Sequence, residues 1–241
     1  MFSPLEQFEN HVFWSFFNFT FSSMAFSLLF AIFFFLLLFL LNLTKVYIIP
    51  TPAQYVLENF YLFIVNMVKS QTGSAGLPYV PLVITVFTFI FCCNFLGLVP
   101  FSFTSTAQIF LPFFISFSLN FGLIIIGFYR HKLSFLKLFV PQGISPILVP
   151  LVFVIEISTY LLRPFSLALR LFANIMAGHT LLFICTTLLY IGFVGSSFVF
   201  AVGILLVSAV IILETLIAVL QAYVFSVLFC VYMNDAINPY H

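Results

Sequence analysis

The sequence predicts an all-α membrane protein with five transmembrane helices and one amphipathic surface helix, in which the last two helices form a long, strongly tilted hairpin. Of its 241 residues, 64% are hydrophobic and 5% are charged, whereas a soluble domain has about 25% charged residues. A transmembrane helix needs about 20 apolar residues, and several stretches of the chain are long enough. We therefore expect a single membrane domain, residues 1–241, surrounded by lipids. The net charge of +1 argues against a nucleic-acid partner.

The first part of this domain, residues 1–78, is expected to hold one span and the surface helix. Residues 24–43 are almost wholly apolar and predict the span. Residues 53–69 have apolar side chains at helical spacing with polar residues between them, which is typical of an amphipathic helix on a membrane surface. Glycines and a proline in residues 71–78 predict a turn after that helix.

The middle part, residues 79–143, is expected to hold the second and third spans. Apolar residues at 82–99 and 109–128 predict these two helices. The short uncharged stretch between them, residues 101–106, predicts a loop.

The last part, residues 144–241, is expected to form the tilted hairpin. Its two apolar stretches, about 151–190 and 198–234, are separated by glycines and serines in residues 192–197. Each stretch would be roughly 55–60 Å long as an α-helix, but the hydrocarbon core is only about 30 Å thick. Upright helices would push apolar turns into water, so steep tilting is predicted.

The distribution of charge predicts the orientation of the spans. Basic residues gather on one side of the membrane if the surface helix is not a span, whereas Glu6 and Glu9 lie on the other side. Because basic loops stay inside, the N-terminus is expected outside and the C-terminus, after five spans, inside. The basic residues used here are Lys45, Lys69, Arg130, Lys132 and Lys137.

Arg170 is the most informative single residue, because it lies in an otherwise apolar stretch of the first hairpin helix. A cation at bilayer depth costs about 2.5–3.5 kcal/mol on insertion scales, and a guanidinium does not escape that cost by losing its proton. No carboxylate lies within four residues of it in the sequence. Compensation must come from water, from the other helix or from another subunit, and such residues commonly mark ion pathways.

Further polar residues share the helix face of Arg170. Glu156, Arg163 and Arg170 are each seven residues apart, close to two helical turns, so they form one stripe. Asn174, four residues after Arg170, continues that stripe. The first hairpin helix therefore carries a polar line along an apolar cylinder.

The second hairpin helix carries a polar line of its own, with Glu214 and Gln221 seven residues apart. A static pair of Arg170 with Glu214 that holds the hairpin together is an alternative, but it leaves the remaining polar residues unexplained. His179 is either a hydrogen-bond donor in packing or a proton relay that titrates near neutral pH. Pro164 is either a tolerated membrane proline or a bend that lets the helix follow a curved partner.

Metal and cofactor sites are not predicted. The four cysteines all lie in apolar segments, where small buried side chains explain them. A haem held by two histidines would need a second histidine within a predicted span, and His179 has no such companion.

Several motifs resemble subunit a of the F-type ATP synthases, in its mitochondrial form. The most specific is RPFSLALRLFANIMAGH at residues 163–179, and NFLGLVP at residues 94–100 is similar to the family's second-span motif. SPLEQFE at residues 3–9 resembles the mitochondrial N-terminus. The C-terminal motif is matched by LQAYVF at residues 220–225 and YMNDA at residues 232–236.

The resemblance implies the stator of a rotary proton-translocating ATP synthase, which is not catalytic alone. Arg170 matches the family's essential arginine, which would separate two offset aqueous half-channels. His179, Glu214 and Gln221 would line the outer half-channel, and Glu156 the inner one. Two further family polar positions, with roles less firmly assigned, are occupied by Arg163 and Asn174.

The resemblance also implies partners and a location. His179 and Glu214 match two positions at which bacterial members carry a carboxylate and an imidazole in the opposite order, which favours the mitochondrial form and a contact between the two side chains. The implied partners are a ring of small proton-carrying hairpin subunits, the peripheral stalk and other membrane subunits of the ATP synthase. The implied location is the mitochondrial inner membrane, with the N-terminus on the intermembrane-space side and the C-terminus on the matrix side.

Two other classes of proton-moving or solute-moving protein are alternatives. A proton-conducting subunit of a respiratory complex typically uses lysine within a broken helix, and no lysine lies in the middle of a predicted span. A secondary transporter should have paired repeats and a midplane substrate site, and neither is apparent in the sequence.

Overall fold

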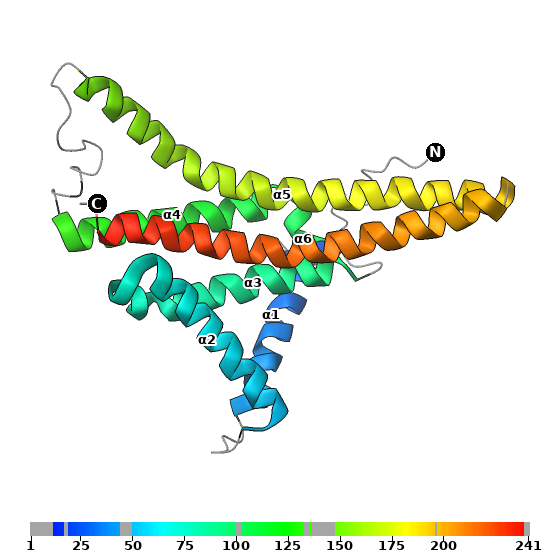
Figure 1. Cartoon of the computed structure of the whole chain (residues 1–241), viewed down its shortest axis with the longest axis horizontal. Helices are drawn as coiled ribbons and strands as arrows, with labels where there is room; N and C mark the ends of the chain where they lie inside the picture. The colour runs from blue at the N-terminus through cyan, green and yellow to red at the C-terminus, as the bar shows by residue number, and fades with distance from the viewer. Residues whose placement is uncertain are drawn as a thin grey trace. The chain divides into compact units, whose positions relative to one another are not determined.

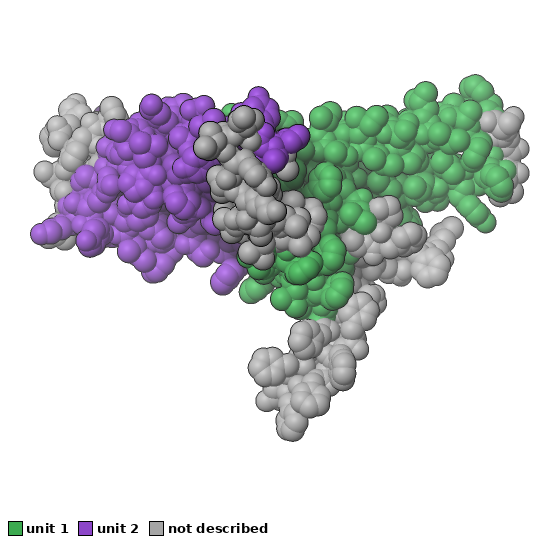
Figure 2. Space-filling model, turned by 90° about the horizontal axis from the view of Figure 1, so that it is seen from below, with its two compact units in different colours: residues 1–41, 88–111, 170–223 green, residues 42–87, 112–169, 224–241 purple. Residues whose placement is uncertain are grey.

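The computed structural model describes residues 12–16, 19–43, 50–99, 103–132, 135, 148–195 and 197–238. These residues are almost entirely helical (Figure 1). The chain divides into two compact units, which Figure 2 shows in different colours. Unit 1 consists of Met1–Leu41, Thr88–Leu111 and Arg170–Tyr223. Unit 2 consists of Asn42–Phe87, Pro112–Leu169 and Val224–His241. The single membrane domain with its three parts stays a prediction.

Four helical stretches in the described part of the chain are long and apolar enough to cross a membrane. They are Gln54–Gly97, Phe110–His131, Val149–Tyr190 and Phe198–Ile237. The predicted first span forms helix α1 (Ser23–Leu43), in which Ser23–Phe33 counts as a shorter apolar helix. The helical, multi-pass class predicted from composition is therefore confirmed, whereas the number of five spans stays a prediction.

A small antiparallel sheet precedes α1, in a region where the sequence predicts no element. Strand β1 (Val12–Phe16) pairs with β2 (Phe19–Ser22), with Trp14 opposite Phe21. Aromatic residues and threonine favour strands, but runs this short cannot be separated from helix by periodicity. The fold is thus not purely helical, although the exception is small.

The amphipathic segment forms helix α2 (Pro52–Thr72). The helix begins there because the Thr51 hydroxyl accepts a hydrogen bond from the Gln54 amide at 3.4 Å, and because proline is suited to the first helical turn. One face of α2 is buried at Ile64 and Val68. Its position on a membrane surface stays a prediction.

The turn predicted at residues 71–78 is formed by the end of α2 and the 3-10 helix η2 (Gly73–Tyr79), which leads into α3 (Val80–Gly97). The chain folds back at η2, because the ring of Phe60 in α2 lies 5.5 Å from that of Phe87 in α3. Two residues this far apart in one straight helix would be separated by roughly 40 Å. The apolar stretch that includes α2 and α3 is therefore not one straight span.

Helix α4 (Phe110–His131) forms the predicted third span, and from Pro112 onward it belongs to unit 2. Its Ser116 hydroxyl donates a hydrogen bond to the carbonyl of Pro164 at 2.6 Å. His131 Nε2 lies 2.8 Å from the carbonyl of Ile237, near the end of the last helix. The short loop before α4 contains the 3-10 helix η3 (Ser105–Ala107).

The predicted hairpin forms α5 (Val149–Gly195) and α6 (Ser197–Ile237), 47 and 41 residues long. The helices are as long as expected, but the break predicted at 192–197 is narrower than expected. Gly192 lies inside α5, at a point where α6 passes close to it. A Cβ atom at position 192 would lie 2.7 Å from the amide nitrogen of Phe200. Glycine here allows close packing and does not end the helix. The tilt stays a prediction.

Helix α5 continues through Pro164. Proline has no amide hydrogen, so the carbonyl of Tyr160 loses its partner four residues on. The Ser116 hydroxyl bonds to the neighbouring Pro164 carbonyl and ties this weakened turn to α4. A bend that follows a curved partner stays a prediction.

Candidate functional site

Four of the predicted site residues form two pairs within unit 1. His179 Nε2 on α5 lies 3.5 Å from Glu214 Oε1 on α6. The Asn174 amide nitrogen, also on α5, donates a hydrogen bond to Gln221 Oε1 at 2.8 Å. Later residues of α6 thus pair with earlier residues of α5, as in an antiparallel pair of helices. The sequence had predicted the first contact, and it could not predict the second.

A glycine gives the Glu214 carboxylate its space between the two helices. A Cβ atom on Gly178 would lie 2.9 Å from Glu214 Oε1, closer than side-chain atoms normally approach. Glu214 and Gln221 are 4% and 5% exposed. A larger residue at position 178 would push the carboxylate away from His179, so the glycine is part of the geometry of this pair.

Arg170 lies on an exposed part of α5. It makes no hydrogen bond or ion pair with any residue that the structure describes. The static Arg170–Glu214 pair is absent among the described residues, and the side chain beside the Glu214 carboxylate is instead His179. The guanidinium is thus free to meet water or a group from outside the described chain.

The other two predicted site residues of α5 lie in unit 2. Glu156 is half-buried and has no hydrogen bond or ion pair within the described ranges. Arg163 forms an ion pair with Asp235 of α6, with 2.8 Å between Nη1 and Oδ2. Its guanidinium also lies over the rings of Tyr232 and Tyr160, 4.9 and 5.3 Å from their centres. Because its charge is matched, Arg163 is suited to fixing α6 against α5.

Asp235 was not among the predicted site residues. Two signals in the sequence pointed to it: it lies fourteen residues after Gln221, a spacing close to four helical turns, and it belongs to the YMNDA motif at residues 232–236. Asn94 was noted only as part of a motif, yet its amide nitrogen donates to the Ala218 carbonyl of α6 at 3.4 Å. Neither pairing could be read from the sequence, since each joins residues more than seventy positions apart.

Removal of either partner of the Arg163–Asp235 pair is expected to destabilise the helix pair. A partly buried ion pair with two aromatic contacts should contribute about 2 kcal/mol. We expect Arg163→Ala and Asp235→Asn each to lower the melting temperature of the purified complex. In the double variant, the melting temperature should fall by less than the sum of the two single decreases. Strictly additive losses in this cycle would rule out a direct interaction. Lys132→Ala, a change of an exposed cation directly after the end of α4, is the control.

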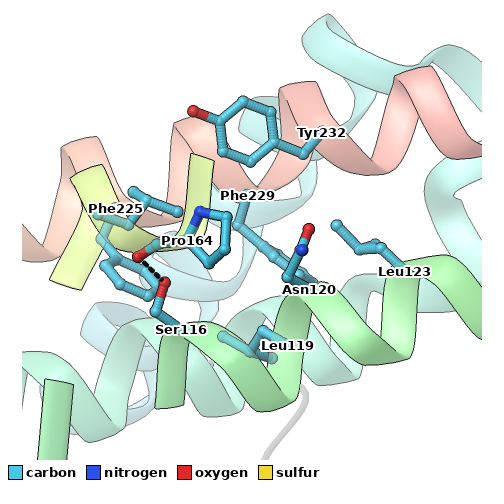
Figure 3. A pocket seen from close by; sticks show the side chains of 9 residues that line it. Ser116, Leu119, Asn120, Leu123, Pro164, Phe225, Phe229 and Tyr232 are labelled. Atoms are coloured by element: carbon cyan, nitrogen blue, oxygen red, sulfur yellow. Dashed lines mark hydrogen bonds between the residues drawn. The ribbon is translucent and has the colours of Figure 1, made fainter. Parts of the chain in front are cut away.

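Unit 2 contains a small cavity of about 10 Å³ between α4, α5 and α6. Figure 3 shows side chains that line it: Leu119, Asn120 and Leu123 from α4, Pro164 from α5 and Phe229 from α6. A cavity this small holds about one water molecule. Its lining includes none of the predicted site residues.

No three histidine, cysteine, aspartate or glutamate side chains come together as metal ligands in the described part of the chain. Cys92, Cys93, Cys185 and Cys230 are buried free thiols. The site is therefore built from charged and amide side chains on two helices, which can bind water and pass protons.

The model of the family described as ATP synthase A chain matches residues 23–234. The chain belongs to this family. It is 41% identical over 246 residues to "ATP synthase subunit a" of Acanthamoeba castellanii, covering 100% of both chains. It is also 41% identical to that of Pelagibacter ubique, over 86% of this chain and 83% of the relative. It is 45% identical to that of Rhizobium meliloti, over 80% of this chain and 78% of the relative. The resemblance predicted from the signature at residues 163–179 is confirmed.

Proposed function

We propose that the chain is the proton-translocating stator subunit of a rotary ATP synthase, in which Arg170 separates two offset aqueous half-channels. The single observation that carries this proposal is that Arg170 is exposed and unpaired within the described chain, on the same helix as His179, which contacts the buried Glu214 of α6. Membership in the ATP synthase A chain family supports the stator role.

The two half-channels follow from the order of residues along α5. His179, paired with Glu214, follows Arg170 in the chain and would line the outer half-channel together with Gln221. Glu156 precedes Arg170 by fourteen residues and would line the inner one. Asn174 would hold Gln221 in place through the 2.8 Å hydrogen bond. A continuous line of water would dissipate the gradient, and a fixed cation between the two halves repels a hopping proton.

Arg170 would act on a carboxylate carried by each ring subunit. An opposite charge nearby favours the ionised form of a carboxylate, so a ring carboxylate that approaches Arg170 gives its proton to the inner half-channel. After passing Arg170 it takes a proton from Glu214 and His179 and enters the lipid as a neutral acid. Neutrality is required because a bare carboxylate in hydrocarbon is very costly.

The attraction must hold the carboxylate only briefly. Two unit charges 4 Å apart interact by about 4 kcal/mol at an effective dielectric constant of 20, whereas a potential of 100 mV supplies about 2.3 kcal/mol per charge. A dry, bidentate pair would stall rotation. We therefore expect a hydrated Arg170, in keeping with its exposure in the isolated chain.

The location and partners follow from the same proposal. We place the chain in the mitochondrial inner membrane, with the N-terminus on the intermembrane-space side and the C-terminus on the matrix side. Its partners are a ring of small hairpin subunits, the peripheral stalk and other membrane subunits of the complex. The relative from Acanthamoeba castellanii, which matches over its whole length, supports this location.

Purification of the complex under mild detergent tests the proposed function. We expect the chain to co-purify with many copies of a small two-helix protein that has one carboxylate in the middle of a span. We also expect the complex, in vesicles, to couple proton flow to ATP synthesis. Isolation with redox cofactors and without such a ring would instead favour a respiratory complex.

A further inference from the structure

Ser116 of α4 uses its hydroxyl group differently from other helical serines of this chain. The hydroxyls of Ser118, Ser158 and Ser208 each donate to the carbonyl three residues earlier in the same helix, at 2.8–2.9 Å. Such bonds are common for serine inside a helix. The Ser116 hydroxyl instead donates to the Pro164 carbonyl of α5 at 2.6 Å, and Ser116 is 2% exposed. This serine therefore ties two helices together.

The bond lies at the weakest turn of α5. Pro164 has no amide hydrogen, so the helix loses one backbone hydrogen bond at this turn and is able to bend there. Pro164 is fully buried, and the ring of the next residue, Phe165, packs edge-on against that of Phe113 in α4 with 5.0 Å between the ring centres. Phe113 and Ser116 are three residues apart on α4 and hold two consecutive residues of α5. The bend of α5 at this turn is therefore set by α4.

Helix α6 holds the same turn of α5 through a separate set of contacts. Arg163 forms its ion pair with Asp235, and the rings of Tyr160 and Tyr232 lie against the Arg163 guanidinium. These titratable and charged groups contact one another, whereas Ser116 donates to a backbone carbonyl. Removal of the Ser116 hydroxyl therefore loosens the tie to α4 and leaves the contacts with α6 in place.

Arg170 follows Pro164 by six residues in the unbroken helix α5. It makes no hydrogen bond or ion pair with any described residue, so the backbone of α5 sets its position. Six residues of α-helix rise about 9 Å, and a change of about 10° in the bend would move Arg170 by roughly 1.5 Å. A misplacement of about 1 Å in a site reduces a rate on the order of a hundredfold. The bend at Pro164 is therefore close enough to Arg170 to matter for its action.

We propose that Ser116 is a positioning residue for proton translocation, which fixes the bend of α5 at Pro164 and thereby the place of Arg170 on the path of the ring carboxylates. The inference rests on the proposed function and adds α4 to the parts that it needs. A ring carboxylate gives up its proton because Arg170 favours its ionised form. With Arg170 displaced, the carboxylate holds its proton more tightly, and release requires a higher pH on the inner side.

Three serine variants, made in the complete ATP synthase, test the inference. Ser116→Ala removes the hydroxyl, and Ser116→Thr keeps it and is the rescue variant. Ser118→Ala, the matched control, removes an exposed hydroxyl of the same helix that donates to the Ile115 carbonyl. ATP synthesis by vesicles is measured while the pH on the release side is varied, and each rate is divided by the parent rate at the same pH.

We expect Ser116→Ala to slow synthesis about threefold or more with the release side near neutral pH. Its rate should approach the parent rate when the release side is made more alkaline by about one unit, because the higher pH removes the more tightly held proton. Ser116→Thr should synthesise ATP at close to the parent rate. Ser118→Ala should follow the parent complex at every pH.

The outcomes separate this inference from the proposed function. If Ser116→Ala matches Ser118→Ala while Arg170→Ala still abolishes synthesis, the positioning role is overturned and the stator role stands. A loss of equal size at every pH, or one that Ser116→Thr shares in full, also overturns the positioning role. Normal synthesis by Arg170→Ala would instead contradict the proposed function. Should Ser116→Ala prevent assembly, Ser116→Cys, which keeps the size of the side chain but donates only weakly, replaces it in the same comparison.

Discussion

Arg170→Ala is expected to abolish proton-driven ATP synthesis and to open a passive proton leak through the membrane sector. The loss follows from the missing interaction of about 4 kcal/mol between a cation and a carboxylate at 4 Å, which corresponds to roughly a thousandfold change in rate. The leak follows because no fixed charge would then separate the two half-channels. Synthesis and the decay of a pH gradient are both measured in vesicles that contain the purified complex.

Arg130→Ala is a suitable control for Arg170→Ala. Arg130 is also exposed, but it lies at the end of α4 with its guanidinium 5.8 Å from the Tyr79 ring centre. This variant should synthesise ATP at close to the parent rate and show no leak. Normal coupled synthesis by Arg170→Ala would contradict the proposed role of Arg170, whatever the control does.

Glu214→Gln is expected to slow proton uptake by about tenfold or more, because a side chain that transfers protons contributes about 10²–10⁴-fold and water can replace part of it. His179→Ala should slow uptake as well, and the double variant should lose less than the two single effects combined. This non-additivity follows from the 3.5 Å contact between the two side chains. The measurement is the initial rate of ATP synthesis at a fixed pH gradient.

Glu58→Gln makes the same chemical change at an exposed position of α2, where the carboxylate bonds only to the nearby Gln54 side chain at 2.8 Å among the contacts described. We expect no change in the rate of synthesis for this variant. If the fold-losses in rate caused by Glu214→Gln and His179→Ala simply multiply in the double variant, the two side chains do not act in one shared step.

The long helices were predictable because their signal is local. Apolar runs of about 40 residues indicate α5 and α6 whatever surrounds them, and Thr51 before Pro52 marks the start of α2. The interruption at residues 192–197 was predicted too broadly because a glycine in the sequence can either end a helix or let two helices approach. At Gly192 the backbone of Phe200 lies close by, so this glycine lets the two helices approach each other.

Of the contacts within the site, the family resemblance predicted that of His179 with Glu214, but the sequence predicted none of the others. Seven-residue spacing placed Arg170 on one face with Glu156 and Arg163, since helical periodicity is fixed by the backbone. Which of them meets a partner depends on the register of α5 against α6, which periodicity does not specify. Thus Arg163 has a carboxylate partner in Asp235, and Arg170 has none among the described residues.

The most direct test of the central claim is a density map of the intact complex that resolves Arg170 and the nearest carboxylate of the ring. We predict that the guanidinium faces the ring, with ordered water between it and the carboxylate in at least some rotary positions. Arg170 facing lipid on the side away from the ring would contradict the account. A dry, bidentate contact in every rotary position would contradict it equally.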